Sequence, residues 1–205
     1  MRKQIEQLRD LQDVCGWFEL PEEDEDGIDV SRFLIVLRGP DQYDPDPRLG
    51  DTPRPSPYAG GFFTVEITTP SCFPARGSDK APPDISFNSA IYHPLVSAEG
   101  STKGKICAEI VKELWMDAWE APHGEPLSLD GVGAVHPSSD APSGEGHLWT
   151  TILMLRKFLV APQWEYFRGI NAEAKGLIRE FKEGEFRKLN MDAFDAKARE
   201  LVQRQ

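Results

Sequence analysis

The residues best suited to chemistry lie in one stretch of the chain, between His93 and Cys107. His93 precedes a proline, and Cys107 ends the segment Gly104-Lys105-Ile106-Cys107. A glycine and an apolar residue before a cysteine predict an extended segment whose thiol is reachable yet shielded. A cysteine thiolate can act as a nucleophile that forms a covalent acyl intermediate. A buried, inert thiol is the alternative, because free cysteine is among the most buried residue types.

Other chemical signatures do not appear in the sequence. The four histidines do not stand with acids or cysteines at the spacing of metal ligands. No glycine pair is followed by the Lys-Ser/Thr of a phosphate-binding loop. The three cysteines form no C-x-x-C pair, which is typical of a reducing compartment. We therefore expect no metal, no cofactor and no disulfide framework.

The composition indicates one acidic globular domain over residues 1–205. The chain is 40% hydrophobic, with 11 Phe and 5 Trp for a core, and roughly 100–200 residues form a typical domain. A formal charge of -11 disfavours nucleic acid and anionic membranes as partners. No apolar run approaches the roughly 20 residues of a membrane span, and the charged start is unlike a signal peptide. We expect an intracellular protein.

Hydrophobic periodicity predicts the elements that would position the chemical residues. A short amphipathic helix is expected at 5–11, and strands at 32–38, 63–67 and 84–87. Residues 41–57 contain five prolines, so we expect an exposed loop there.

The second half of the chain predicts helices after a loop. Residues 119–146 are rich in Pro, Gly, Ser and Asp, which predicts a flexible insertion. Leu148, Ile152, Leu155 and Leu159 form the apolar stripe of a central helix. Asn171 is placed to cap a helix that includes Phe181, and Asn190 to cap a last helix with Phe194 and Ala198.

Seven short motifs follow one another along the chain: Arg38-Gly39-Pro40, Ser56–Phe63, Cys72-Phe73-Pro74, Pro82–Phe87, Ile91–Pro94, Gly104–Cys107 and Trp115. In this order they resemble the motifs of the ubiquitin-conjugating enzymes, the family that carries ubiquitin or a ubiquitin-like protein as a cysteine thioester. The C-terminal segments are also similar to the two last helices of the family.

The resemblance implies an α+β fold of the UBC type. This fold has an N-terminal helix, a four-stranded antiparallel meander, an active-site flap, a central helix and two C-terminal helices. Cys107 is then the nucleophile that accepts the ubiquitin carboxy terminus by thioester exchange, and the residues that support the active-site loop are Tyr92, His93, Pro94 and Leu95. The implied partners of this monomer are ubiquitin or a ubiquitin-like protein, the activating enzyme that consumes ATP, a RING-type or HECT-type ligase and a protein substrate.

The chain departs from the family pattern close to Cys107. Leu95 stands where the family has the asparagine of His-Pro-Asn, whose amide supports the loop and stabilises an oxyanion. Loss of one oxyanion donor costs roughly 2.7–4 kcal/mol, so slow transfer to lysine is expected unless another group substitutes. His93 is interpreted as bracing the loop, with acid–base catalysis as the alternative. The family's Asp-Pro-Asn after the central helix is replaced by Ala161-Pro162-Gln163, which leaves Glu165 as the nearest acid.

The resemblance also implies two partner surfaces. Phe73 and the segment Met116-Asp117-Ala118 correspond to the loops that face ligases, although an aromatic residue is also commonly buried in a core. Arg2, Lys3 and Arg9 correspond to the basic face that docks the activating enzyme, with an ordinary solvated face as the alternative. The insertion at 119–146 is either a tolerated loop or a change to the ligase surface.

The sequence therefore predicts a ubiquitin-conjugating enzyme, located in the cytoplasm, the nucleus or both. A regulatory relative that binds ubiquitin or a ligase without catalysis is the main alternative. Leu95 favours that alternative, whereas the intact Gly-x-Ile-Cys context of Cys107 argues against it. A third possibility is a carrier for a ubiquitin-like protein, or one that transfers to Cys, Ser or an amino terminus.

Overall fold

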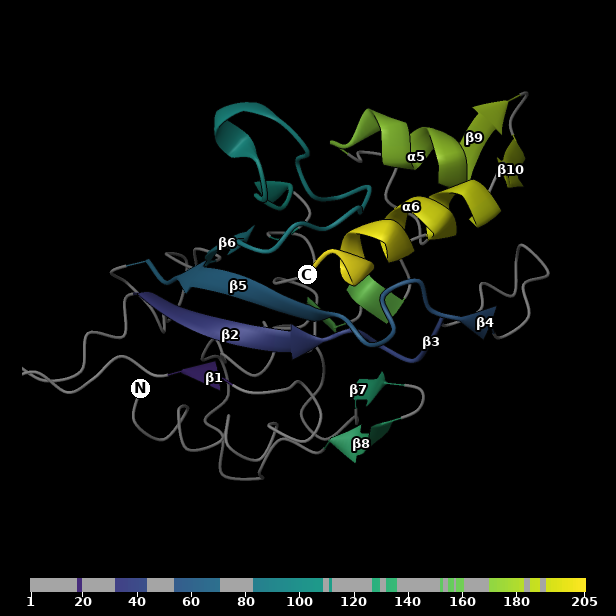
Figure 1. Ribbon diagram of the computed structural model, residues 1–205. Coiled ribbons are helices and arrows are strands. Elements are labelled where there is room, and N and C mark those ends of the chain that lie inside the picture. The colour runs from purple at the N-terminus through teal and green to yellow at the C-terminus, as the bar shows by residue number, and fades with distance from the viewer. Residues whose placement is uncertain are drawn as a thin grey trace, which may run out of the picture.

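The structure is a computed structural model. It describes residues 18–19, 32–43, 54–70, 83–108, 111, 127–129, 132–135, 152, 155–156, 158–160, 170–182, 185–188 and 191–205. Its centre is an antiparallel sheet with the strand order β1-β2-β5-β6 (Figure 1). The strands are β1 (Phe18–Glu19), β2 (Arg32–Arg38), β5 (Phe62–Thr68) and β6 (Asp84–Phe87). The predicted four-stranded antiparallel sheet is confirmed.

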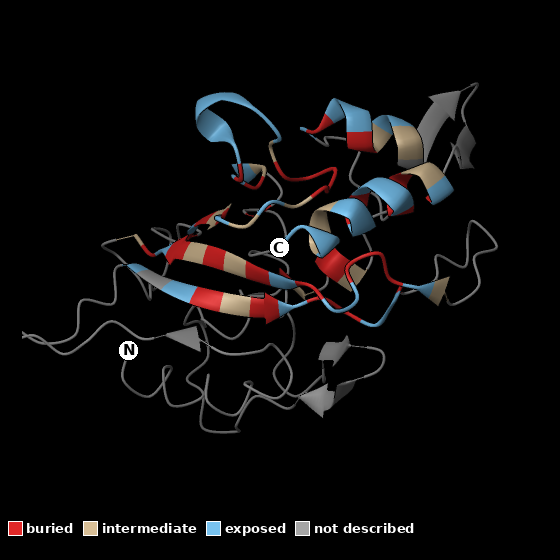
Figure 2. Cartoon of the chain, viewed as in Figure 1, coloured by how far each residue is buried: buried red, intermediate tan, exposed pale blue. Residues whose placement is uncertain are grey.

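Each of the two long strands of the sheet has one buried face and one more exposed face. β2 and β5 pair along their whole length, from Arg32 opposite Thr68 to Arg38 opposite Phe62. Burial alternates along both strands (Figure 2), because successive side chains of a strand point to opposite faces. The core side of the sheet carries Ile35, Leu37, Phe63, Val65, Ile67, Ile85 and Phe87.

Helical residues supply the other side of this core. Ile152, Leu155, Phe158 and Leu159 are helical and buried, as the apolar stripe predicts. The helices α5 (Ala172–Ile178) and α6 (Met191–Gln203) lie side by side in Figure 1. Beyond the end of α6, the Gln205 side chain accepts a hydrogen bond of 3.2 Å from the N–H of Phe62 at the start of β5.

The predicted helix from Asn171 to Phe181 is shorter in the structure. Asn171 caps it as expected, because its Oδ1 accepts the N–H of Ala174 at 3.1 Å. The helix α5 ends at Ile178, and Phe181 lies in β9 (Arg179–Lys182), which pairs with β10 (Glu185–Lys188). The prediction was wrong at this end. The sequence places Gly184 in the two-residue gap between the strands, a composition that favours a hairpin over a continued helix.

Two segments predicted to be loops contain short strands. Within 41–57, β3 (Gln42–Tyr43) pairs with β4 (Arg54–Pro55), and the adjacent Ser56-Pro57-Tyr58 is buried. The prediction of an exposed loop was wrong at these residues. Tyr43 and Tyr58 bury large aromatic rings, and this burial stabilises the segment despite its many prolines. Within 119–146, β7 (Leu127–Leu129) pairs with β8 (Val132–Val135), so those residues are not irregular.

Several predicted features lie outside the described residues. These are the N-terminal helix at 5–11, the middle of the proline-rich loop, the start of the central helix at Leu148 and the cap at Asn190. Among the helices that the structure describes, none is long and apolar enough to cross a membrane.

Candidate active site

Cys107 ends an extended segment that is held on both edges. On one side, the N–H of Phe87 donates to the carbonyl of Gly104 at 2.8 Å, and the N–H of Ile106 donates to the carbonyl of Ile85 at 3.2 Å. On the other side, the N–H of Cys107 donates to the carbonyl of Leu95 at 3.1 Å. The segment is therefore bound between β6 and the loop that follows His93, and the Cys107 side chain is half-buried at its end.

Gly104 makes this close approach possible. Its φ of 82° is a left-handed conformation that favours glycine. A Cβ at this position would lie 2.2 Å from the carbonyl oxygen of Phe87, which is closer than any real contact. The glycine in Gly104-Lys105-Ile106-Cys107 thus lets the chain turn out of the η3 loop (Gly100–Thr102) and pack directly against β6.

His93 braces the neighbouring loop with both ring nitrogens. Its Nδ1 accepts the N–H of Leu95 at 3.1 Å, so Nε2 carries the proton and donates to the carbonyl of Phe158 at 2.9 Å. That carbonyl cannot receive the usual helical hydrogen bond, because the residue four positions later is Pro162. Burial lowers the pKa of His93 to about 4. The geometry is that of a neutral bracing residue.

Pro94 and Leu95 are also built into the core. The carbonyl of Pro94 accepts the N–H of Asn171 at 3.0 Å, which joins the loop to the start of α5. The Leu95 side chain is only 1% exposed. Leu95 therefore serves Cys107 through its main-chain carbonyl, while its side chain fills the interior.

Tyr58 supports the same loop from a segment 34 residues earlier in the chain. Its ring is fully buried, and its hydroxyl donates to the carbonyl of Tyr92 at 2.7 Å. The ring also lies 6.2 Å from the His93 ring, centroid to centroid. The N–H of Gly61 donates to the carbonyl of Tyr58 at 3.0 Å, which closes the turn that holds the tyrosine in place. Two separate sequence motifs, around Tyr58 and around His93, thus meet in space.

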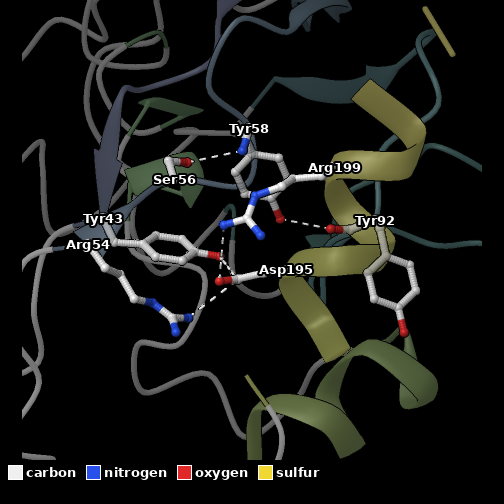
Figure 3. Close-up of polar contacts among 7 residues, drawn as sticks. All are labelled: Tyr43, Arg54, Ser56, Tyr58, Tyr92, Asp195 and Arg199. Atoms are coloured by element: carbon white, nitrogen blue, oxygen red, sulfur yellow. Dashed lines mark hydrogen bonds and ion pairs between the residues drawn. The ribbon is translucent and has the colours of Figure 1, made fainter. Parts of the chain in front are cut away.

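A buried carboxylate anchors α6 beside Tyr58. Figure 3 shows the Asp195 carboxylate facing Tyr43, Arg54 and Arg199. Asp195 Oδ1 accepts the hydroxyl of Tyr43 at 3.1 Å and Nη2 of Arg54 at 3.3 Å, and Arg199 lies 3.6 Å from Oδ2. Burial raises the pKa of Asp195, while the nearby guanidinium groups act in the opposite direction. This cluster ties the last helix to β3 and β4.

Known proteins are similar to the part of the chain that contains Tyr58, His93 and Cys107. Residues 51–123 match the family model described as ubiquitin-conjugating enzyme. Ubiquitin-conjugating enzyme E2 1 of Schizosaccharomyces pombe is 41% identical over 87 residues, which are 42% of this chain and 30% of that protein. The probable ubiquitin-conjugating enzyme E2 31 of Arabidopsis thaliana is 33% identical over 89 residues, which are 43% of this chain and 44% of that protein. Part of the chain is thus similar to ubiquitin-conjugating enzymes.

A solved structure extends the similarity of the fold. The E2 domain of a Toxoplasma gondii ubiquitin conjugating enzyme aligns with a TM-score of 0.52 at 20% identity, over 99% of this chain and 96% of that chain. This likeness confirms the α+β fold of the UBC type. The matched regions are 30% and 44% of the lengths of the two curated relatives.

The structure brings together part of the predicted site. Tyr92, His93, Pro94, Leu95 and Cys107 lie on adjoining segments joined by the hydrogen bonds above. The remaining predicted residues lie outside the described part of the chain: Glu165, Phe73, Met116, Asp117, Ala118, Arg2, Lys3 and Arg9. In the residues that are described, no group of three or more His, Cys, Asp or Glu side chains could hold a metal ion.

Sequence reasoning missed the residues that support the loop from a distance. It did not connect Tyr58 with Tyr92, and it assigned no role to Asp195. Asn171 was expected only as a helix cap, whereas its N–H also holds Pro94. Asp195 is an acidic residue on the inward face of a helix. This placement could have indicated a polar cluster, because a buried carboxylate needs hydrogen-bond or charged partners.

Proposed function

We propose that this chain is a carrier that accepts ubiquitin or a ubiquitin-like protein as a thioester on Cys107. The Cys107 thiolate would attack the thioester of the charged activating enzyme. The new carbon–sulfur bond forms on Cys107, and the thiol of the activating enzyme is released. The cargo would then pass to a substrate amine or to a ligase thiol.

The observation that carries this proposal is the placement of the thiol. Cys107 is half-buried at the end of a segment bonded on both edges, so its position is set by the main chain. A positioned nucleophile loses little freedom on reaction, which is a large part of its advantage over a free thiol. The similarity to ubiquitin-conjugating enzymes supports the same role.

The partners that this function requires are ubiquitin or a related protein, the activating enzyme and a RING-type or HECT-type ligase. The proposal needs no resident metal or cofactor, since ATP is used upstream. We also propose an intracellular location, in the cytoplasm, the nucleus or both, on the basis of composition and the widely spaced cysteines.

A charging assay tests the proposal. The chain is incubated with activating enzyme, ATP and ubiquitin, and the products are separated on gels with and without reductant. A reductant-sensitive adduct in the wild type that is missing in Cys107→Ala supports the carrier. A matched Cys107→Ser variant should give a reductant-resistant ester, because oxygen replaces sulfur at the same position.

The second candidate is a regulatory relative that binds ubiquitin or a ligase without forming a thioester. The buried Leu95 side chain favours it, because this residue offers no amide to stabilise a reacting oxyanion. Failure to charge with ubiquitin and with a panel of ubiquitin-like proteins would support this candidate and reject the carrier.

A further inference from the structure

Lys105 and Cys107 lie on the same face of one extended segment. The hydrogen bonds of Gly104 and Ile106 run toward β6, whereas the carbonyl of Lys105 and the N–H of Cys107 bond to the loop after His93. Residues two apart in a strand share a face. Burial agrees, because Gly104 and Ile106 are buried while Lys105 is exposed and Cys107 is half-buried.

The main chain fixes the place of Lys105 in this segment. Its N–H donates to the carbonyl of Thr102 at 2.9 Å, and its carbonyl accepts the N–H of Ser97 at 2.9 Å. On the opposite edge, Lys105 forms an antiparallel bridge with Ser86 of β6. The base of the Lys105 side chain is therefore positioned by the backbone, two residues before the thiol.

Asp84 directs the Lys105 amine toward the thiol. Lys105 Nζ donates to Asp84 Oδ2 at 3.0 Å. The bridge between Ser86 and Lys105 sets an antiparallel register that places Asp84 opposite Cys107. Opposite residues have Cβ atoms about 4.5–5.5 Å apart. The Lys105 amine is thus bound by the residue that faces the thiol.

Transfer from Cys107 creates a negative charge beside this amine. When an acceptor amine attacks a thioester, the carbonyl oxygen becomes an oxyanion, and a donor or a cation next to it lowers the barrier. The resemblance assigns this task to an asparagine amide, whereas Leu95 has no amide and its side chain is buried. We propose that the Lys105 ammonium stabilises the oxyanion in place of that amide, an inference that rests on the proposed carrier function.

Lys105 keeps its own proton throughout the transfer. The nitrogen of the acceptor amine forms a bond with the carbonyl carbon, and the carbonyl electrons move to the oxygen, to which the Lys105 ammonium donates a hydrogen bond. The carbonyl then re-forms, the carbon–sulfur bond breaks and Cys107 leaves as the thiolate. The proton of the attacking amine passes to water. Lys105 acts through its charge and its N–H donors.

The Lys105 side chain can reach the reacting oxygen without a change in the main chain. Residues two apart in a strand are about 6.6 Å apart along the chain, and the amine is carried on a flexible four-carbon stem. The ion pair with Asp84 is largely exposed, so it holds the amine weakly and lets it turn toward the oxyanion. In such a solvated place, one unit charge about 4 Å from the oxyanion changes the rate about fivefold.

The test measures transfer from charged Cys107 to hydroxylamine, an amine that is uncharged near neutral pH and is therefore not repelled by a lysine. The wild type, Lys105→Met and Lys105→Arg are charged with ubiquitin, and a chelator then stops the activating enzyme. Loss of the thioester is followed at several hydroxylamine concentrations. The slope of the rate against concentration reports transfer to hydroxylamine, while any transfer to lysines of the protein itself adds only to the intercept.

The two variants at position 105 separate charge from side-chain volume. Lys105→Met should lower the slope about fivefold, because methionine has no charge and no N–H donor. Lys105→Arg should restore most of the slope, because the guanidinium keeps both. The ratio of the wild-type slope to the Lys105→Met slope should fall as salt is added, since salt screens an exposed charge. A ratio that is independent of salt would contradict an electrostatic role.

Lys103 provides a matched control two residues away. It is exposed, and the positive φ of Gly104 interrupts the strand between Lys103 and Lys105, so the shared face does not extend to Lys103. Lys103→Met removes the same charge from the same loop and should keep the wild-type slope. A loss equal to that of Lys105→Met would show a general effect of loop charge and overturn the proposal.

The thioester and the slope separate this inference from the function on which it rests. If each protein forms the reductant-sensitive thioester but Lys105→Met has the wild-type slope, the carrier stands and the role of Lys105 is rejected. A slope that is equally low in Lys105→Arg also rejects this role, because the charge is then not the cause. If the wild type forms no thioester, the carrier itself fails.

Discussion

The main-chain N–H of Cys107 and the main-chain carbonyl of Leu95 are joined by a hydrogen bond of 3.1 Å. Leu95 therefore positions the nucleophile with its backbone, and any residue at this position would retain that bond. The side chain has a separate task, because it is one of the largest fully buried groups of the core. The position that the resemblance equates with the family's asparagine is an interior packing position in this protein.

Replacing Leu95 should lower the stability of the fold. We expect Leu95→Ala to reduce the free energy of unfolding by about 2–5 kcal/mol, the usual cost of truncating a buried leucine. Leu95→Asn should cost at least as much, since it buries an amide without a partner. Urea unfolding measures both, and Leu95→Met serves as a volume-conserving control. A Leu95→Asn protein as stable as the wild type would contradict the buried placement.

The pH dependence of stability should report His93. Burial lowers the pKa of His93 from its ordinary value of 6.5 to about 4 in the folded protein. As pH falls below 6.5, His93 becomes protonated in the unfolded chain but stays neutral in the folded protein. The free energy of unfolding therefore decreases between about pH 6.5 and pH 4, and this group does not change it above pH 6.5. The loss amounts to about 3 kcal/mol.

The His93→Ala variant isolates that contribution. It is less stable than the wild type near neutral pH, because the N–H of Leu95 and the carbonyl of Phe158 both lose their partner. The difference between wild type and variant should shrink as pH falls from 6.5 to 4. A difference that stays constant over this range would show that His93 titrates normally.

Removing one hydroxyl should test the support that Tyr58 gives to the loop. Tyr58→Phe leaves the buried carbonyl of Tyr92 without its donor, at a cost of about 1–3 kcal/mol in unfolding free energy. Tyr92→Phe is the matched control, because the Tyr92 hydroxyl has no hydrogen-bond partner among the described residues. That variant should be neutral or more stable. Equal losses in the two variants would argue against the Tyr58 contact.

Two glycines in the segment before Cys107 allow the cost of backbone strain to be separated from the cost of a steric clash. Gly100 and Gly104 both have positive φ, of 70° and 82°. A Cβ on Gly100 would meet nothing within 4 Å, whereas one on Gly104 would collide with the carbonyl of Phe87. Gly100→Ala should therefore cost about 1–2 kcal/mol from strain alone, and Gly104→Ala distinctly more. Thermal unfolding measures both, and similar losses would contradict the close approach of Gly104 to β6.

Local patterns in the sequence were sufficient for the elements with strong periodicity. The alternation of Phe63, Val65 and Ile67 predicted β5, and the stripe through Ile152, Leu155 and Leu159 predicted a buried helix. Both patterns record which face of an element is buried, and that information lies within a few neighbouring residues. Hydrophobic spacing gave the wrong prediction at Phe181, which was assigned to a helix but lies in β9. A short run of apolar residues is compatible with either a helix or a hairpin.

The sequence by itself determined the extended segment that ends at Cys107, the cap at Asn171 and the resemblance to the ubiquitin-conjugating enzymes. Only the tertiary structure decided that His93 bonds to Phe158, that Tyr58 supports Tyr92, and that Asp195 binds Tyr43 and Arg54. These partners are separated by 34 to 152 residues along the chain. Their pairing depends on how the sheet and helices pack, because a buried polar group takes whichever partner the fold brings within reach.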